Sequence, residues 1–390
     1  MKMRVDNVHK RLLRDGFGYH DSSEGDVPGQ REARPCLMAI SSEFCDDPAP
    51  FERGAKIRGE EAMKRFFHAA LLQFLTCGAM LLLAASLTSA GAADKLRVAK
   101  VVPFAWTFTP LDIGIQMGIF AKHGLDIEES ASSGDAKLQQ LLTSGSVDIG
   151  IGSGPSMAFS AKGVPAKAVA AMYGLPRNMA VMVGYDSDVK TVDDLKGKKL
   201  GVTTVGSLTA WIGQRINEKE GWNGNGIDVV PIGGMPPARA AIKMRQIDGY
   251  IGALEVGYKL EEAKEWRVIT TATPFVDHFI THVIFARDEL IEKHPETVRA
   301  FLEGWFETIA FMKANKTKAV EISAKVIDVS PAVAARAFDE QMPYFSTDGT
   351  FDPQAVASLK KSFIDMGLLD TIPDDKALFT TEFVPVKAAM

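Results

Sequence analysis

The sequence predicts an α/β protein of two lobes that face each other across a cleft, followed by extra C-terminal helices. From residue 94 onward, segments typical of strands alternate with segments typical of helices, which indicates layered lobes with mostly parallel sheets. One stretch, SSGDAKLQQLLTSGSVDIGIGSG at 132–154, also resembles GGMPPARAAIKMRQIDGYIGALE at 233–255. At an offset of 100 residues and without a gap, the matching pairs are Gly134 and Gly234, Asp148 and Asp248, Ile151 and Ile251, and Gly152 and Gly252. At 390 residues the chain is longer than one ordinary domain. We therefore expect two copies of one unit.

The front of the chain carries the features of a secretory signal peptide at 63–92. A basic start precedes an apolar run at 66–87, and small residues follow as a cleavage site of the A-x-A type. We expect cleavage near Ala92 and export to the periplasm. A transmembrane anchor is the alternative, since about 20 apolar residues can span a bilayer. Because such a signal begins a chain, residues 1–62 are expected to be a non-native or disordered extension.

The first lobe is expected to open with a strand at 96–102. The next helix begins at Thr109–Pro110, where a hydroxyl cap and a first-turn proline favour helix initiation. That helix ends at Gly124, because glycine readily takes the left-handed C-terminal conformation. Further strands of this lobe are expected at 125–128, 147–151, 168–173 and 180–183.

The second lobe repeats this order. Its strands are expected at 199–203, 227–230 and 267–270, and a strand at 280–286 is expected to return to the first lobe. The sequence after residue 288 is typical of helices, and we expect these helices to pack on the first lobe. They are expected at 295–315, 316–327, 331–342 and 353–366. The resulting division assigns 94–185 with 275–390 to lobe 1, and 186–274 to lobe 2.

Small-residue loops at the strand ends are the first candidates for a binding site. In open α/β sheets ligands bind beyond the carboxyl ends of the strands, and here several of those ends carry a Gly/Ser/Thr loop that opens a helix. Helix N-termini present unpaired N–H groups that favour an anion or a polar acceptor, although each serine alone is typical of an ordinary turn. The candidates are Ser133, Gly134, Ser153 and Gly154 in one lobe and Gly206, Ser207, Thr209 and Gly234 in the other.

Larger side chains near these loops complete the expected site. Phe104, Trp106, Thr107 and Tyr173 lie in or next to loops at strand ends, so we expect them to line the cleft, although aromatic residues also fill cores. Two further residues come from the second copy of the repeat. Met235 is expected to supply an adaptable apolar wall, and Glu255 either meets a ligand amine or caps a helix.

Other groups of residues in the sequence do not match a nucleotide-binding, metal-binding or nucleophile motif. The glycines at 150–154 lack the spacing of a dinucleotide loop, and no P-loop lysine follows 201–206. His278 and His282 are four apart, but their surroundings are typical of a strand, which favours a hinge role over a metal pair. No nucleophile elbow is present in the sequence. We therefore expect neither an enzyme nor a cofactor.

The net charge and the cysteine positions limit which partners and which covalent bonds we expect. The formal net charge of −5 gives no reason to expect nucleic acid as a partner. The three cysteines are Cys36, Cys45 and Cys77, so the part beyond residue 94 has neither a disulfide nor thiol chemistry.

Three short sequence segments resemble segments of a known family. They are GIFAKHGLDI at 118–127, LTSGSVDIG at 142–150 and DDLKGKKLGV at 193–202. Together they resemble the periplasmic substrate-binding proteins of ABC importers, in the nitrate/sulfonate/taurine group that also includes binders of thiamine-pyrimidine precursors. The resemblance covers nearly all of 94–370. It implies a type II periplasmic binding fold, in which two lobes close on a ligand by a hinge motion.

The resemblance also implies a function. It implies an exported, monomeric binding protein that captures a small anionic or heterocyclic solute, sulfonate-, nitrate- or taurine-like or pyrimidine-like, between the lobes. The solute would pass to an inner-membrane ABC permease with its ATPase. The cysteine-rich motif of the pyrimidine-synthesising relatives is absent. An enzyme on the same fold and a ligand-sensing receptor for a signalling partner remain the alternatives, and the solute itself stays open.

Overall fold

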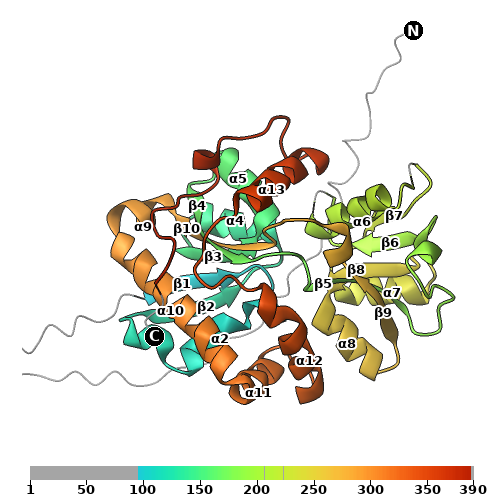
Figure 1. Cartoon of the computed structure of the whole chain (residues 1–390), viewed down its shortest axis with the longest axis horizontal. Helices are drawn as coiled ribbons and strands as arrows, with labels where there is room; N and C mark the ends of the chain where they lie inside the picture. The colour runs from blue at the N-terminus through green and yellow to red at the C-terminus, as the bar shows by residue number, and fades with distance from the viewer. Residues whose placement is uncertain (1–94, 206, 223, 388–390) are drawn as a thin grey trace, which may run out of the picture. The chain divides into compact units, whose positions relative to one another are not determined.

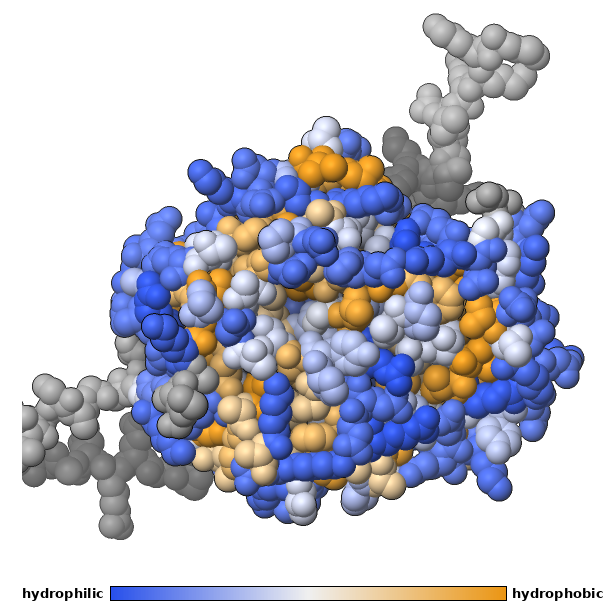
Figure 2. Space-filling view, viewed as in Figure 1, coloured by the Kyte–Doolittle hydropathy of each residue, from blue (hydrophilic) through white to orange (hydrophobic). Residues whose placement is uncertain are grey.

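The computed structural model describes residues 95–205, 207–222 and 224–387. The expected signal peptide and the extension ahead of it lie outside these residues. Two five-stranded sheets form the framework, and they occupy separate halves of the view in Figure 1. No helix of the described chain is long and apolar enough to cross a bilayer. On the face drawn in Figure 2, hydrophilic residues predominate and hydrophobic ones form separate patches.

The first sheet has the strand order β2-β1-β3-β10-β4. Its strands β1, β2 and β3 are mutually parallel, and β10 runs antiparallel between β3 and β4. The strands are β1 (Lys95–Lys100), β2 (Asp126–Ala131), β3 (Ile149–Ser153), β4 (Ala166–Tyr173) and β10 (His282–Arg287). The connecting helices are η1 (Trp106–Phe108), α2 (Thr109–Gln116), α3 (Ile119–Lys122), α4 (Asp135–Thr143), η2 (Gly154–Ser156) and α5 (Met157–Ala161).

The second sheet has the order β7-β6-β8-β5-β9, which is the same topology with β5 as the antiparallel member. Its strands are β5 (Met179–Gly184), β6 (Lys199–Val202), β7 (Asp228–Pro231), β8 (Gly249–Ala253) and β9 (Trp266–Thr271). Its helices are η3 (Asp193–Leu195), α6 (Leu208–Lys219), α7 (Met235–Lys243), α8 (Leu254–Glu262) and η4 (Thr273–Phe275). The expected two-lobed α/β fold is confirmed.

The repeat in the sequence corresponds to a repeat in hydrogen bonding. Asp148 donates its N–H to the Arg97 carbonyl over 2.9 Å, and its carboxylate accepts from the Arg97 N–H over 3.1 Å. Asp248 makes the same pair of bonds with Lys199, over 2.7 and 2.8 Å. Each aspartate therefore uses two hydrogen bonds to link the residue just before one central strand, β3 or β8, to the neighbouring strand, β1 or β6.

One strand lies in the other sheet from the one expected. The apolar segment at 180–183 was expected in the first lobe, but β5 pairs with β8 and β9 of the second sheet. The chain therefore crosses between the lobes at 174–178, before β5, and crosses back between β9 and β10. An apolar strand that is buried on both faces suits the centre of either sheet, so its composition does not indicate which sheet it joins.

The C-terminal helices follow the expected boundaries closely. They are α9 (Asp288–Lys293), α10 (Pro295–Ala314), α11 (Lys316–Val326), α12 (Pro331–Gln341), η5 (Met342–Tyr344), α13 (Pro353–Asp365) and η6 (Asp375–Ala377). They were expected to pack on the first lobe; α12 contacts α11 and η1 there, but it also packs on the second lobe. This helix lies between α11 and α8, a helix of the second lobe (Figure 1). Its residue Val333 belongs to an apolar cluster of the second lobe, whereas Phe338 belongs to a larger cluster with residues from both lobes.

Candidate ligand-binding site

A buried polar cluster lies where the two lobes meet. From the first lobe, the loop after β1 leads into η1, and Thr109 holds this short helix by donating its hydroxyl to the Trp106 carbonyl over 2.8 Å. From the second lobe, α8 begins directly after β8 and carries Glu255 in its first turn. Strand ends of both sheets therefore deliver side chains to one place, as expected for this class of fold.

Glu255 joins the two lobes directly. Its Oε1 accepts a hydrogen bond from the Trp106 backbone N–H over 2.8 Å, and its Oε2 accepts one from Gln341 Nε2 over 3.1 Å. Only 1% of the residue is exposed. Burial raises the pKa of the carboxyl, and these hydrogen bonds oppose the rise. Because Gln341 ends α12, the carboxylate connects three separate parts of the chain.

A directional chain of hydrogen bonds continues from Gln341. The Thr107 hydroxyl donates to Gln341 Oε1 over 3.2 Å and accepts from Asn178 Nδ2 over 3.0 Å. The Asn178 Nδ2 also lies 2.8 Å from His282 Nε2. Since an amide nitrogen only donates, this Nε2 accepts and the neutral ring carries its proton on Nδ1. Burial lowers the pKa of His282 to about 3, so the ring is neutral at ordinary pH.

Aromatic rings surround these polar groups. Trp106 meets Phe345 edge-on with centroids 5.8 Å apart, and Tyr173 meets the same ring at 5.1 Å. Tyr173 also lies 6.1 Å from the His282 ring. Trp106 and Tyr173 are each 1% exposed or less. The Tyr173 hydroxyl and the Asn178 Oδ1 are buried without a hydrogen-bond partner among the described residues. Such groups are costly to bury unpaired, and they are therefore candidates for contacts with a ligand.

Of the candidates from the sequence, four belong to this cluster: Trp106, Thr107, Tyr173 and Glu255. Phe104 precedes it in the chain but is 62% exposed. The loop candidates of the first lobe have roles within the lobe. Ser133 is exposed, and Gly134 is the N-cap residue of α4 with a φ of 127°, which favours glycine. None of these placements tests ligand contact directly, so all remain predictions.

The other two first-lobe loop residues are held by protein contacts. Ser153 donates its N–H and its hydroxyl to the Asp135 carboxylate over 3.0 and 2.8 Å. A Cβ on Gly154 would lie 1.9 Å from the Ile280 carbonyl oxygen, so this glycine allows the returning chain to pass close by. Both contacts explain the small residue at its position without a ligand.

The candidates of the second lobe lie mainly at helix starts. Ser207 caps α6 by accepting from the Ala210 N–H over 3.2 Å, and Thr209 Oγ1 accepts from the Thr203 N–H over 3.0 Å. Gly234 is the N-cap residue of α7, and Met235 begins that helix against the apolar cluster of the second lobe. Gly206 lies outside the described residues. These loops thus present helix N-termini, as expected, but their hydroxyls already have partners.

Three members of the cluster are absent from the sequence-based candidates. Asn178 lies in the first crossing between the lobes, His282 begins the strand after the second crossing, and Gln341 ends α12. His282 was interpreted as a hinge-strand residue, and its place at the start of β10 agrees. No local signal distinguishes Asn178 or Gln341, because both act through residues distant in the chain.

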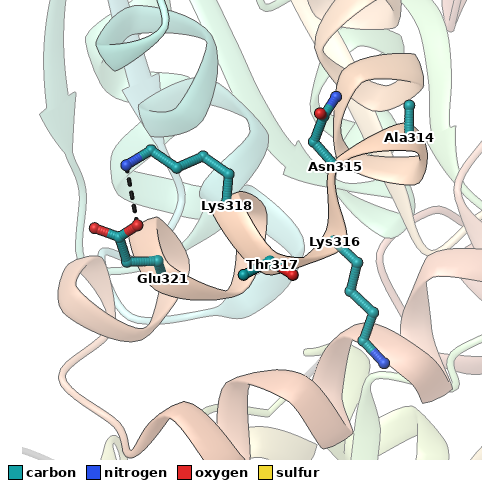
Figure 3. A pocket seen from close by; sticks show the side chains of 6 residues that line it. All are labelled: Ala314, Asn315, Lys316, Thr317, Lys318 and Glu321. Atoms are coloured by element: carbon teal, nitrogen blue, oxygen red, sulfur yellow. Dashed lines mark hydrogen bonds and ion pairs between the residues drawn. The ribbon is translucent and has the colours of Figure 1, made fainter.

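Two arginines, at 177 and 239, are paired with glutamates. Arg177 forms an ion pair with Glu340, and Arg239 forms one with Glu265. A shallow hollow of about 480 Å³ lies at the junction of α10 and α11 (Figure 3). Its lining residues are exposed, and its Lys318 is paired with Glu321 over 3.0 Å. This hollow is remote from the strand ends, so it is not our candidate. The described residues hold no group of acidic, histidine or cysteine side chains suited to a metal.

Two lobes of equal topology, two chain crossings and a buried polar interface define the class of two-lobed binding-protein folds. The chain belongs to the NMT1/THI5-like family, whose sequence profile matches residues 106–319. A protein of Brucella abortus that is named as a binding protein is 26% identical over 329 residues, covering 79% of this chain and 98% of that protein. In Saccharomyces cerevisiae, 4-amino-5-hydroxymethyl-2-methylpyrimidine phosphate synthase THI13 is 26% identical over 227 residues, which cover 55% of this chain and 67% of the yeast protein.

Solved structures show the same fold. The alkanesulfonate-binding protein SsuA of Xanthomonas axonopodis pv. citri, bound to MOPS, superimposes with a TM-score of 0.62 at 17% identity, covering 73% of this chain and 98% of that one. A Candida albicans protein described as having the generic periplasmic binding protein fold gives a TM-score of 0.60 at 20% identity, with 73% and 92% covered. The desulfurization enzyme DszB gives 0.52 at 14% identity, with 74% and 97% covered. The fold thus serves both binding proteins and enzymes.

Proposed function

We propose that this protein is an exported solute-binding protein that captures a small anionic or heterocyclic solute between its lobes and delivers it to an ABC permease. The observation that carries the proposal is the buried cluster of Trp106, Tyr173, Asn178 and Glu255, to which both lobes contribute. A site of this kind is complete only when the lobes are together, so solute binding and lobe closure are coupled. Family membership and the binding proteins among the relatives support the proposal.

The proposal includes a periplasmic location, a monomeric state and a membrane partner. The signal-like segment at 63–92 supports export. The partner would be an inner-membrane permease with its ATPase, because the SsuA proteins that share the fold are named as sulfonate-binding and one is named as an ABC transporter component. A receptor that presents its liganded form to a signalling protein would use the same lobes.

A screen of ligand classes by thermal shift tests this proposal. We expect at least one compound among alkanesulfonates, nitrate, taurine and aminopyrimidines to raise the melting temperature of the full chain. A ligand present at about 100 times its Kd stabilises the folded state by about 2.7 kcal/mol. The compound should be recovered unchanged after incubation, as checked by mass spectrometry. If no compound changes the transition, the proposed ligand class is wrong.

Recovery of a converted product would favour the alternative, an enzyme on this fold. The yeast relatives named as synthases give that alternative its basis. Two features speak against it. The neutral ring of His282 is a poor proton donor at ordinary pH, because its pKa is lowered to about 3. The chain beyond Cys77 also contains no cysteine that could act as a nucleophile.

A further inference from the structure

Glu255 is a buried carboxylate whose protein partners are both neutral. The two hydrogen bonds it accepts come from a backbone N–H and a side-chain amide. Among the described residues, no lysine, arginine or histidine forms an ion pair with it. The first turn of α8 adds the favourable field of a helix N-terminus. An ionised group so enclosed lacks the compensating charge that buried carboxylates ordinarily have.

With the amides of Asn178 and Gln341 oriented as in the structure, both oxygens of Glu255 accept. The Thr107 hydroxyl donates to Gln341 Oε1, so the other atom of that amide is the nitrogen, which can only donate to Glu255 Oε2. The Trp106 N–H likewise can only donate to Oε1. Each carboxylate oxygen retains a lone pair, because it can accept two hydrogen bonds. The group is thus arranged as an acceptor with capacity for another donor.

The cluster has unused acceptors but no unpaired cation. Among the described residues, the Asn178 Oδ1 is a buried acceptor without a partner and the Tyr173 hydroxyl is also unpaired, while the Trp106 Nε1 and His282 Nδ1 are buried donors without a partner that suit an acceptor atom of the same solute. The cations of nearby segments are already neutralised: Arg177 by Glu340, and Lys100 by Asp112 and Glu129. An anionic group brought beside Glu255 would meet a like charge in a poorly solvated place, which is unfavourable. A group that carries N–H donors would satisfy the same atoms.

We propose that Glu255 forms the subsite for a nitrogen group of the solute, either a protonated amine or the amino group of a heterocycle. The subsite selects for solutes with this group and against solutes whose polar atoms are exclusively anionic. This inference rests on the proposed function and narrows its ligand class.

Matched pairs of solutes test the subsite on the wild-type full chain. In one pair, 2-aminoethanesulfonate is compared with 2-hydroxyethanesulfonate; in the other, 4-amino-2-methylpyrimidine is compared with 4-hydroxy-2-methylpyrimidine. A hydrogen bond to a charged group contributes about 1.5–3 kcal/mol, so we expect the amino member of a pair to bind at least about tenfold more tightly by calorimetry. Equal affinities within a pair that binds would overturn the subsite.

A variant separates recognition from mere support of the lobes. Glu255→Gln keeps the shape and removes the charge, and we expect it to weaken the amino solute by about tenfold or more while leaving the hydroxy solute within about threefold. Glu321→Gln, at an exposed position of α11, is the matched control and should change neither affinity. An equal loss for both solutes would show that Glu255 only holds the lobes together, and it would overturn the inference.

The outcomes distinguish this inference from the proposed function. If none of the four solutes nor any compound of the wider screen binds, the proposed function itself is wrong. If solutes bind without preference for the amino group, only the subsite is wrong. Should Glu255→Gln fail to fold, as judged by its thermal transition, the comparison within each pair on the wild-type chain still decides.

Discussion

His282 shows how the surroundings of one residue set its chemistry. The ring is 6% exposed, lies against Phe108 and Tyr173, and accepts from Asn178 at Nε2. Protonation would place a second hydrogen on a nitrogen that already receives one, in a site with little water. The folded chain therefore holds this residue neutral, whereas the unfolded chain protonates it near pH 6.5.

The lowered pKa of His282 predicts a loss of stability in acid. A group whose pKa is lower in the folded state contributes stability above its unfolded pKa, and this contribution is lost as the pH falls toward the folded value of about 3. Between about pH 7 and pH 5 the loss from this one residue is roughly 2 kcal/mol. We expect His282→Gln, whose amide oxygen can accept from Asn178, to show a correspondingly smaller fall in urea-unfolding free energy.

The exposed His294 supplies the control for that measurement. It lies at the start of α10 with its Nδ1 3.3 Å from Glu296 Oε1, and because exposed ion pairs contribute little, His294→Gln should stay close to the pH dependence of the wild-type chain. Asp112, whose pKa burial raises to about 6, acts in the opposite direction and is common to all three proteins. An identical pH dependence in the wild-type chain and His282→Gln would contradict the prediction.

At the scale of elements, α12 differs most from expectation. It was expected at 331–342 and lies at Pro331–Gln341, where Ser330 caps its start; such boundaries depend on neighbouring residues. Its contacts with α8 were not predictable in the same way. Arg336 lies 3.5 Å over the Tyr258 ring and pairs with Glu261 over 2.9 Å, and Ser330 donates to Glu262 over 2.7 Å. These partners are about 70 residues away, beyond the reach of any local pattern.

The contact of α12 with α8 predicts a measurable contribution from Arg336. We expect Arg336→Ala to lower the free energy of unfolding by about 1 kcal/mol, combining a partly exposed ion pair with a cation–π contact. The measurement is urea unfolding at low and high salt, and part of the difference should disappear at high salt. Lys318→Ala, whose partner Glu321 lies on its own helix, is the control. Equal effects of the two substitutions would show that the interlobe contact contributes nothing.

The candidate site likewise combines features that depend on neighbouring residues with features that depend on contacts between distant segments. The sequence indicated Trp106, Thr107, Tyr173 and Glu255, because strand ends of α/β sheets are where ligands bind. It also favoured Ser153 and Gly154, whose roles depend on Asp135 and the Ile280 carbonyl and could not be inferred without the packing. Gln341 was missed because only the tertiary fold brings α12 to the lobe interface. Local rules thus predicted the framework, and long-range contacts assembled the interior of the site.

At the scale of the whole molecule, the second lobe begins and ends at one place. Ala180 of β5 lies opposite Thr271 of β9, and on the other side Tyr173 of β4 lies opposite His282 of β10. The two segments that cross between the lobes, from β4 to β5 and from β9 to β10, therefore start and end at strands that are neighbours in their sheets. The segment from β5 to β9 contains a complete sheet with its helices, apart from the side chains that α12 contributes to its apolar cluster.

This arrangement predicts that a fragment of residues 178–272 folds alone but binds solute poorly. Far-UV circular dichroism should show mixed α/β structure and a cooperative thermal transition, lower than that of the full chain because Val333 no longer covers its cluster. Calorimetry with a solute of the full chain should show affinity reduced by at least about 100-fold, since half of the contacts are gone. Full affinity in the fragment would contradict a site shared by both lobes.

The adjacency of β5 and β9 has a further consequence for how such a protein can change. The second lobe stands in the first as a guest domain stands in its host, attached at two neighbouring points and encoded by one uninterrupted stretch. A recombination event that exchanged this stretch would replace the second-lobe part of the candidate site, including Glu255, and leave the first-lobe part with Trp106 and Tyr173 untouched. The preference for a solute could then change through replacement of this one segment, while the packing of the first lobe stays the same.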